Sequence, residues 1–305
     1  MRMRSFLIGL TLAAVLFGTG TAFAESTAAQ LFADGQALLA RADFNGAMEA
    51  FKAATKAEPE NSDYFQEYSL LRRVLNLRTQ LKDEEDQETW QKMSRALFNY
   101  YFSHKINNEA LTVAQSLHAK VGTGETAALL AAAQLELGQN EAAATLLAGL
   151  ATDQGTLQTT ILHGIALARL GKLDQAKTLA GTVEIPKDCD GQVCFDAARL
   201  HAWVGNTDQA LSLLKCAFEC TPPNQLDAVK ADAKASKDLS KLTTDAGFAQ
   251  VLETKSKVAA GGCGKCPNKA ACAGASKEKE GAAGCKEHEK QGEKAPGCDH
   301  DKKDK

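Results

Sequence analysis

The chain lacks any apolar run long enough to span a bilayer. Its most apolar stretch, Phe6–Phe17 (FLIGLTLAAVLF), has 12 residues, whereas a membrane helix needs about 20. Arg2 and Arg4 precede this stretch, and Ala22-Phe23-Ala24 follows it. A basic start, a short apolar segment and an A-x-A site together predict a secretory signal peptide over residues 1–24, cleaved after Ala24. We therefore expect an exported protein, periplasmic or secreted, with no membrane span.

The end of the chain lacks large apolar side chains altogether. Residues 261–305 contain no Val, Ile, Leu, Met, Phe, Trp or Tyr. Such a segment cannot bury enough surface to offset the entropy cost of ordering it. We therefore predict a folded domain over residues 25–255 and a disordered Cys- and Lys-rich tail over residues 256–305.

The tail is nevertheless rich in soft metal ligands. Thiolates and imidazoles on a flexible chain suit Cu(I) or Zn, and the candidate ligands are Cys263, Cys266, Cys272, Cys285, His288, Cys298 and His300. Disulfides, scrambled or intermolecular, remain an alternative, and so does redox work by the C-x2-C pair. Gly261 and Gly262 argue against redox work, because they predict no helix N-terminus that would lower the pKa of the thiols.

The sequence also lacks a basic surface and a catalytic motif. The net charge is −3, and it becomes −7 for the body of the chain, residues 25–260, once the two signal arginines and the net +2 of residues 261–305 are set aside. An acidic body argues against a nucleic-acid partner. We find no nucleophile motif, no phosphate-binding glycine loop and no acid–base pair of carboxylates. His163 and His201 are expected to fill the core, and His104 and His118 have no evident partner. We therefore predict no enzyme activity and no obligatory cofactor.

The body does contain an internal sequence repeat whose apolar residues have the spacing of helices. Alanines recur at Ala110, Ala143, Ala176 and Ala210, separated by 33, 33 and 34 residues. The last three follow a shared phrase, GQNEA, GKLDQA and GNTDQA. Glycine ends one helix in the left-handed conformation, an acid opens the next, and the small Ala allows close helix packing. A period near 34 residues with these parts predicts a helical solenoid.

The first unit of this kind resembles the tetratricopeptide repeat. Gly35, Ala47, Phe51 and Pro59 fall at the family spacings, with Leu31, Asp34 and Leu38 standing for its Trp, Leu and Tyr. The resemblance covers about Ala28 to Leu252. It implies an all-α fold, a right-handed superhelix of helical hairpins that binds a protein or peptide in its concave groove.

One repeat is irregular, because 63 residues separate Ala47 from Ala110. Residues 63–81 read as one long helix with an apolar side. The run Lys82–Glu88 (KDEEDQE) is then expected to open the helix that carries Trp90 to Phe102, since acidic residues favour a helix N-terminus. The alternative is that this acidic run is a binding patch.

The last repeat resembles the module that closes many bacterial arrays of this family. The closing pattern D-L-x2-L-x2-D-x2-F is matched by Asp238, Leu239, Leu242, Asp245 and Phe248. Ala246 stands where the family usually has Pro, which is a departure from the pattern.

Four cysteines lie in this last repeat, as Cys189-x4-Cys194 and Cys216-x3-Cys220. The repeat places Cys194 at the start of one helix and Cys216 near the end of its antiparallel partner, so the two pairs should meet. We expect disulfides from Cys194 to Cys216 and from Cys189 to Cys220, each stabilising by about 3 kcal/mol. A four-thiolate zinc site is the alternative.

The groove implied by the resemblance has candidate contact residues on the first helices of the repeats. They are Arg95, Asn99, Ile165, Arg169, Phe195, Arg199 and Trp203. Arginines beside aromatics are common at binding hot spots, although the same aromatics could instead belong to the core.

Three functions follow from these patterns. The first is an exported, non-enzymatic scaffold or adaptor that binds a protein or peptide through the groove. The alternatives are an envelope metal-handling protein that captures Cu(I) or Zn through its tail, and a thiol oxidoreductase. The partner and the oligomeric state are not encoded in any pattern we recognise.

Overall fold

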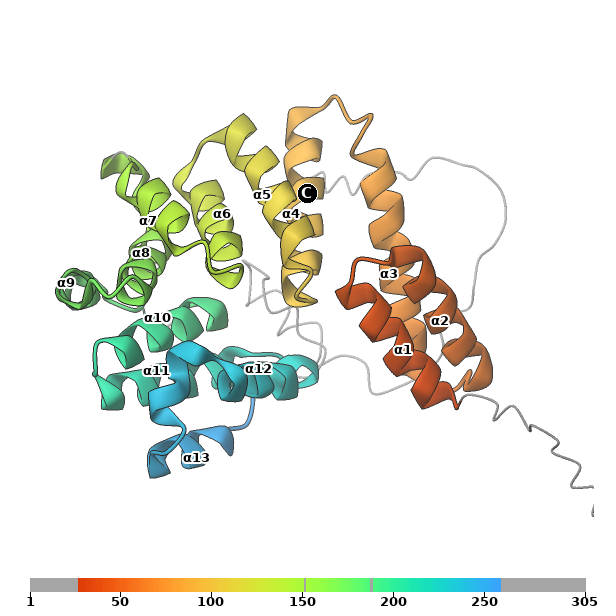
Figure 1. Ribbon diagram of the computed structural model, residues 1–305. Helices are drawn as coiled ribbons and strands as arrows, with labels where there is room; N and C mark the ends of the chain where they lie inside the picture. The colour runs from red at the N-terminus through yellow and green to blue at the C-terminus, as the bar shows by residue number, and fades with distance from the viewer. Residues whose placement is uncertain (1–26, 151, 187–188, 259–305) are drawn as a thin grey trace, which may run out of the picture. The chain divides into compact units, whose positions relative to one another are not determined.

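The structure, a computed structural model, describes residues 27–150, 152–186 and 189–258. The predicted signal peptide and nearly all of the predicted tail therefore lie outside the described residues. Within those residues every regular element is helical (Figure 1). The α-helices are α1 Ala28–Ala40, α2 Phe44–Ala57, α3 Ser62–Gln80, α4 Gln87–Ser103, α5 Asn107–Val121, α6 Gly124–Glu136, α7 Asn140–Ala148, α8 Leu157–Arg169, α9 Leu173–Thr182, α10 Gly191–Trp203, α11 Thr207–Cys220, α12 Pro223–Ala235 and α13 Ala246–Leu252. Two 3-10 helices, η1 Thr152–Gln154 and η2 Lys237–Leu242, complete the set.

The chain divides into two compact units. Unit 1 comprises the residues up to Cys189 together with Asp196–Ala210, and unit 2 comprises Asp190–Phe195 and the residues from Leu211 onward. None of the helices in the described residues is long and apolar enough to cross a membrane.

In unit 1, consecutive helices pack against one another as hairpins. Contacts join α1 to α2, α4 to α5, α6 to α7 and α8 to α9, and α6 also packs against α8 (Figure 1). In a helical repeat array, each first helix contacts both its own partner helix and the first helix of the next hairpin, as α6 does here.

The repeat seen in the sequence has a common local structure. The alanine of each repeat is the fourth residue of its second helix and is fully buried; these residues are Ala47, Ala110, Ala143, Ala176 and Ala210. Five residues before each alanine the backbone has a positive φ, at Ala42, Lys105, Gly138, Gly171 and Gly205. Each turn between paired helices therefore contains one residue in the left-handed conformation, which glycine adopts without steric cost.

The core of unit 1 is built from large side chains between small ones. Phe51, Leu71, Leu97 and Tyr101 are each no more than 1% exposed and belong to one apolar cluster. Phe51 packs directly over Gly35 of α1, where an added Cβ would lie 2.5 Å from the ring. Gly35 thus serves close helix packing, as its place in the repeat pattern indicates.

Helix α3 accounts for the irregular spacing. It runs over Ser62–Gln80, which agrees with the single long helix predicted for residues 63–81. The next helix, α4, is capped by Asp86, whose side chain accepts a hydrogen bond of 2.8 Å from the backbone N–H of Thr89. The acidic run therefore does open a helix, as predicted.

Unit 2 contains the first turn of α10, most of α11, and the elements α12, η2 and α13. Leu214, Phe218 and Leu239 are fully buried in it, and Phe248 of α13 is 3% exposed. Gly247 of α13 lies against Leu211, where an added Cβ would meet the leucine side chain at 2.7 Å. The short helix α13 therefore covers part of α11.

The predicted all-α fold of helical hairpins is confirmed for the described residues. The assignment of these hairpins to the tetratricopeptide type stays a prediction. The right-handed superhelix and the domain limits at residues 25 and 255 stay predictions.

Candidate functional site

A hollow of about 500 Å³ opens at the N-terminal ends of α6 and α8. Residues from α4, from the α5–α6 turn, from η1 and from the cap of α8 line it: Gln91, Arg95, Val121, Thr123, Gly124, Glu125, Asp153, Gln154 and Thr156. Most of these side chains are polar. The hollow therefore offers a ligand hydrogen-bonding groups together with a comparable area of apolar surface.

The two helix starts beside this hollow are rigidly capped. The side chains of Thr123 and Thr156 accept hydrogen bonds from the backbone N–H groups of Thr126 and Thr159, respectively. In return, the hydroxyls of Thr126 and Thr159 accept hydrogen bonds from the backbone N–H groups of Thr123 and Thr156. Such capping boxes satisfy the exposed N–H groups at a helix start. The rim of the hollow is therefore preorganised.

Arg95 is the cationic group of the hollow. Its Nη2 lies 2.9 Å from Oε2 of Glu125, and its side chain is 35% exposed, against 71% for Glu125. An ion pair this exposed contributes little to stability, so Arg95 can exchange Glu125 for a ligand at small cost. Asn99, one helical turn further along α4, is also exposed.

The other predicted groove arginines join first helices to one another. Nη1 of Arg169, at the end of α8, donates a 2.6 Å hydrogen bond to the backbone carbonyl of Leu135 in α6. Arg199 of α10 is 7% exposed and makes ion pairs with Asp196 at 2.9 Å and with Glu136 at 3.1 Å. Asp196 also accepts a 2.7 Å bond from Gln158 of α8.

These contacts correct part of the groove prediction. Ile165 is fully buried and belongs to the core, because position 165 faces the neighbouring helices. Arg199 is a buried structural residue, because two carboxylates already hold its guanidinium. Trp203 and Phe195 are half-buried; Trp203 lies in unit 1 and Phe195 in unit 2. Their part in a groove stays a prediction.

His104 has an acidic partner that the sequence did not reveal. Its Nε2 lies 3.0 Å from Oε1 of Glu67 in α3, and its Nδ1 lies 2.8 Å from the carbonyl oxygen of Tyr100. The imidazole packs on the Tyr100 ring with centroids 4.0 Å apart. Burial alone would lower the pKa of His104, but the hydrogen bond and charge of Glu67 and the Tyr100 carbonyl outweigh it and raise that pKa. The pair joins α3 to α4, 37 residues apart in sequence.

The stability contributed by His104 should depend on pH. Because the pKa is higher in the folded state, this contribution is complete below the unfolded pKa of about 6.5 and is lost as pH rises through the folded value. We expect His104→Gln to lower the urea midpoint at about pH 6 and to have a smaller effect at about pH 8.5. An equal loss at both pH values would contradict the assignment.

His201 is a core residue, as the sequence indicated, whereas His163 is only half-buried. His201 is 6% exposed, with its Nδ1 3.2 Å from the amide of Asn206. Burial lowers the pKa of both histidines, which favours the neutral imidazole.

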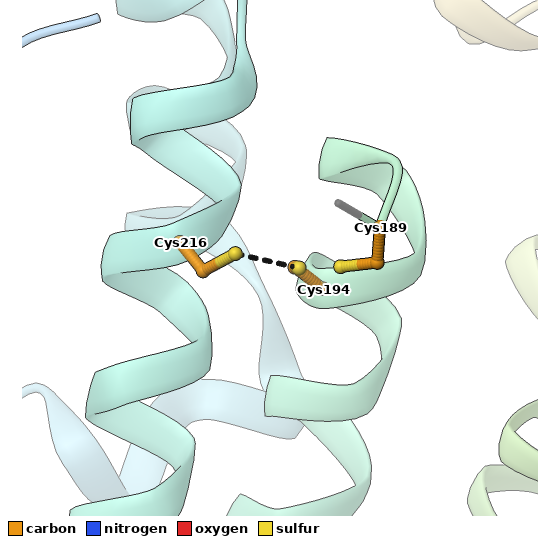
Figure 2. A group of neighbouring side chains, drawn as sticks. All are labelled: Cys189, Cys194 and Cys216. Carbon is orange, nitrogen blue, oxygen red and sulfur yellow. Dashed lines mark hydrogen bonds between the residues drawn. The ribbon is translucent and has the colours of Figure 1, made fainter. Parts of the chain in front are cut away.

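The four cysteines of the body meet at one end of α10 and α11, but not in the predicted pairing. Cys189 and Cys194 are the disulfide-bonded cysteines among the described residues, and Cys216 and Cys220 are free thiols. The expected approach of Cys194 to Cys216 is confirmed: their sulfurs are 2.9 Å apart (Figure 2). The predicted Cys194–Cys216 and Cys189–Cys220 bonds are wrong, because Cys189 and Cys194 are disulfide-bonded whereas Cys216 and Cys220 are free thiols. The seven predicted metal ligands of the tail lie outside the described residues.

No family model matches the chain, and no curated protein matches it. Two solved structures are similar in fold. One is a tetratricopeptide repeat protein from Parabacteroides merdae ATCC 43184, with 14% identity, coverage of 74% of this chain and 98% of that chain, and a TM-score of 0.39. The other is YrrB, described as a TPR protein with an unusual peptide-binding site, with 17% identity, coverage of 67% and 91%, and a TM-score of 0.29. Both TM-scores are low, so the proposals below depend on this chain's own residues.

Proposed function

We propose that this protein is an exported, non-enzymatic adaptor that binds an extended peptide or a protein segment through the hollow at the starts of α6 and α8. The observation that carries the proposal is the hollow itself, about 500 Å³ in volume and lined mainly by polar side chains on capped helix ends. Export is supported only by the sequence of residues 1–24; an intact mass of the envelope-derived protein that still includes these residues would contradict it.

The chemistry of the hollow suits a peptide. Gln91 and Gln154 can both donate to and accept from a peptide backbone, while Arg95 can hold a carboxylate and Glu125 or Asp153 a basic side chain. Because the rim is held by capping hydrogen bonds, little conformational freedom is lost on binding.

The array also has a candidate closing element, the segment that ends in D-L-x2-L-x2-D-x2-F. Leu239, Leu242 and Phe248 are at most 3% exposed, and Asp245 caps α13 by accepting a 2.7 Å bond from the N–H of Gly247. A terminal cover of this kind keeps the last apolar helix face from solvent, which supports assigning the segment as the closing module.

The binding test uses a random peptide library displayed on phage, selected against the full chain. We expect enriched peptides to bind with micromolar affinity and Arg95→Glu to weaken binding about 10-fold, since loss of one charged contact costs about 1.4 kcal/mol. Fluorescence polarisation with the enriched peptides measures the effect.

Lys92→Glu is the matched control. Lys92 lies on the same helix, pairs with Glu88 and is 72% exposed, but it does not line the hollow. The same change of charge there should leave the peptide affinity within about 2-fold. Equal effects of both substitutions, or none from Arg95→Glu, would overturn the assignment of the hollow.

A further inference from the structure

Four cysteine side chains gather where the start of α10 meets the end of α11. The sulfurs of Cys189, Cys194 and Cys216 all lie within 4.8 Å of one another, and Figure 2 shows them converging from the two helix ends. Cys194 is fully buried. The residues of the chain that the structure describes contain four cysteines, and this one cluster includes three of them.

Cys220 lies beside the same cluster. An added Cβ on Gly191, in the first turn of α10, would lie 3.4 Å from the Cβ of Cys220 and 3.1 Å from the carbonyl oxygen of Ala217. Gly191 therefore lets the start of α10 approach the last turn of α11 closely. Cys220 also hydrogen-bonds with Cys216, four residues earlier on α11. Cys220 therefore lies next to Cys216 at the edge of the three-sulfur group, from which it can supply a fourth thiol.

We propose that reduction of the disulfide at Cys189 and Cys194 converts this cluster into a four-thiolate Zn²⁺ site. Tetrahedral zinc has Zn–S distances of about 2.3 Å, which place its sulfur ligands about 3.8 Å apart. The sulfurs of Cys194 and Cys216 are 2.9 Å apart, and those of Cys189, Cys194 and Cys216 all lie within 4.8 Å of one another, so small movements would bring them to that spacing once the disulfide is reduced. Side-chain rotations at the two helix ends would therefore suffice to enclose the ion.

The reaction balances in two steps. A dithiol reductant delivers two electrons and two protons to the S–S bond, which gives two thiols on the protein and a disulfide on the reductant. Zn²⁺ then displaces the protons of all four thiols, which leaves a centre with a net charge of −2. Exchange with a disulfide oxidant, which takes up the two electrons and is reduced to two thiols, restores the Cys189–Cys194 bond; this removes two of the four ligands, and the ion is released as the other two thiolates take up protons.

One feature of the surroundings offsets that negative charge: the cluster adjoins the N-terminus of α10, where the helix dipole favours thiolates. Lys257 also lowers the pKa of Cys216, but its ion-pair partner Glu219, whose Oε2 lies 2.9 Å from the Lys257 Nζ, raises that pKa more. The backbone N–H of Lys257 also donates a 2.9 Å bond to the carbonyl of Glu219, which fixes this segment at the end of α11.

Without a metal, burial together with the charge and hydrogen bond of Cys220 raises the pKa of Cys216 to about 11, so this thiol is protonated at neutral pH. A bound Zn²⁺ reverses this preference, because it deprotonates a coordinating thiol.

The test uses the full chain with its five tail cysteines replaced by Ser, so that only the body thiols can contribute. Co²⁺ and Zn²⁺ are added separately and anaerobically, once to the oxidised protein and once after reduction by dithiothreitol and its removal. We expect one metal ion per reduced chain, with the visible absorption of tetrahedral cobalt–thiolate, and none bound by the oxidised chain. Failure of the reduced chain to bind either metal, or equal binding by both forms, would overturn the proposal.

Variants of the body cysteines separate this site from other metal binding. We expect Cys220→Ser, at a partly exposed position, and Cys216→Ser each to weaken Zn²⁺ binding by more than about 10-fold. Circular dichroism of each variant checks that the helices are retained. Unchanged affinity in both variants would show that the metal lies elsewhere. Peptide binding by the hollow is measured separately and does not depend on this outcome.

Discussion

Replacing Arg199 with Ala is expected to destabilise unit 1 by about 3–5 kcal/mol, because it leaves a buried carboxylate without its cation. The side chains of Arg199 and Asp196 are 8% and 3% exposed, so water cannot take the place of the guanidinium. Glu136, 27% exposed, also loses its partner. Urea unfolding followed by circular dichroism measures the loss.

Two further variants identify the cause of this loss. Arg95→Ala removes an arginine whose ion pair is exposed, and it should cost no more than about 1 kcal/mol. The double variant Arg199→Met/Asp196→Ala removes both buried charges and should be more stable than Arg199→Ala. A loss below about 1 kcal/mol for Arg199→Ala, or a double variant that is less stable still, would contradict the explanation that an unpaired buried carboxylate causes the loss.

Helix positions could be predicted from the sequence because their signals are local. The left-handed glycines at residues 138, 171 and 205, and the acid after each of them, fix where a helix ends and the next begins. Two turns of the same kind escaped notice, because Ala42 and Lys105 adopt the left-handed conformation, each at a φ of 59°. Neither residue favours it, so tertiary packing must hold these turns.

The faces of the helices were harder to predict than their limits. The groove prediction grouped Ile165, Arg169 and Arg199, yet Ile165 is fully buried and Arg199 is enclosed by carboxylates. Each first helix packs against two neighbours, so its apolar stripe is broad and the exposed stripe is narrow. An arginine on such a helix can therefore be a buried link between repeats, and only the position of Glu136, 63 residues away, reveals it.

Pairings between distant residues were equally hard to predict. The sequence correctly brought Cys194 close to Cys216, because antiparallel helices place the start of one beside the end of the other. It could not decide which sulfur bonds to which, since three sulfurs lie within 4.8 Å. The hollow was missed for the same reason, because it depends on the contact of Gly124 with Gln154 of η1, which lies 30 residues further along the chain.

That contact leads to the second large expected effect. An added Cβ on Gly124 would overlap the carbonyl oxygen of Gln154 and would lie 3.0 Å from its carbonyl carbon. Because the obstacle is backbone, it cannot rotate away as a side chain could. We expect Gly124→Ala to destabilise unit 1 by about 3 kcal/mol and to disturb peptide binding, since Gly124 and Gln154 both line the hollow.

Gly181→Ala is the matched control with the opposite expected sign. Gly181 lies in the last turns of α9, and an added Cβ there meets no atom within 4 Å. Alanine favours a helix more than glycine does, so this change should stabilise the protein by up to about 1 kcal/mol. Urea midpoints that move in opposite directions would show that packing at Gly124, rather than a general response to Gly→Ala, sets the geometry of the hollow. If Gly124→Ala were as stable as the native chain, η1 would have to lie away from α6, and the hollow between them would not exist in the form that the proposed peptide site requires.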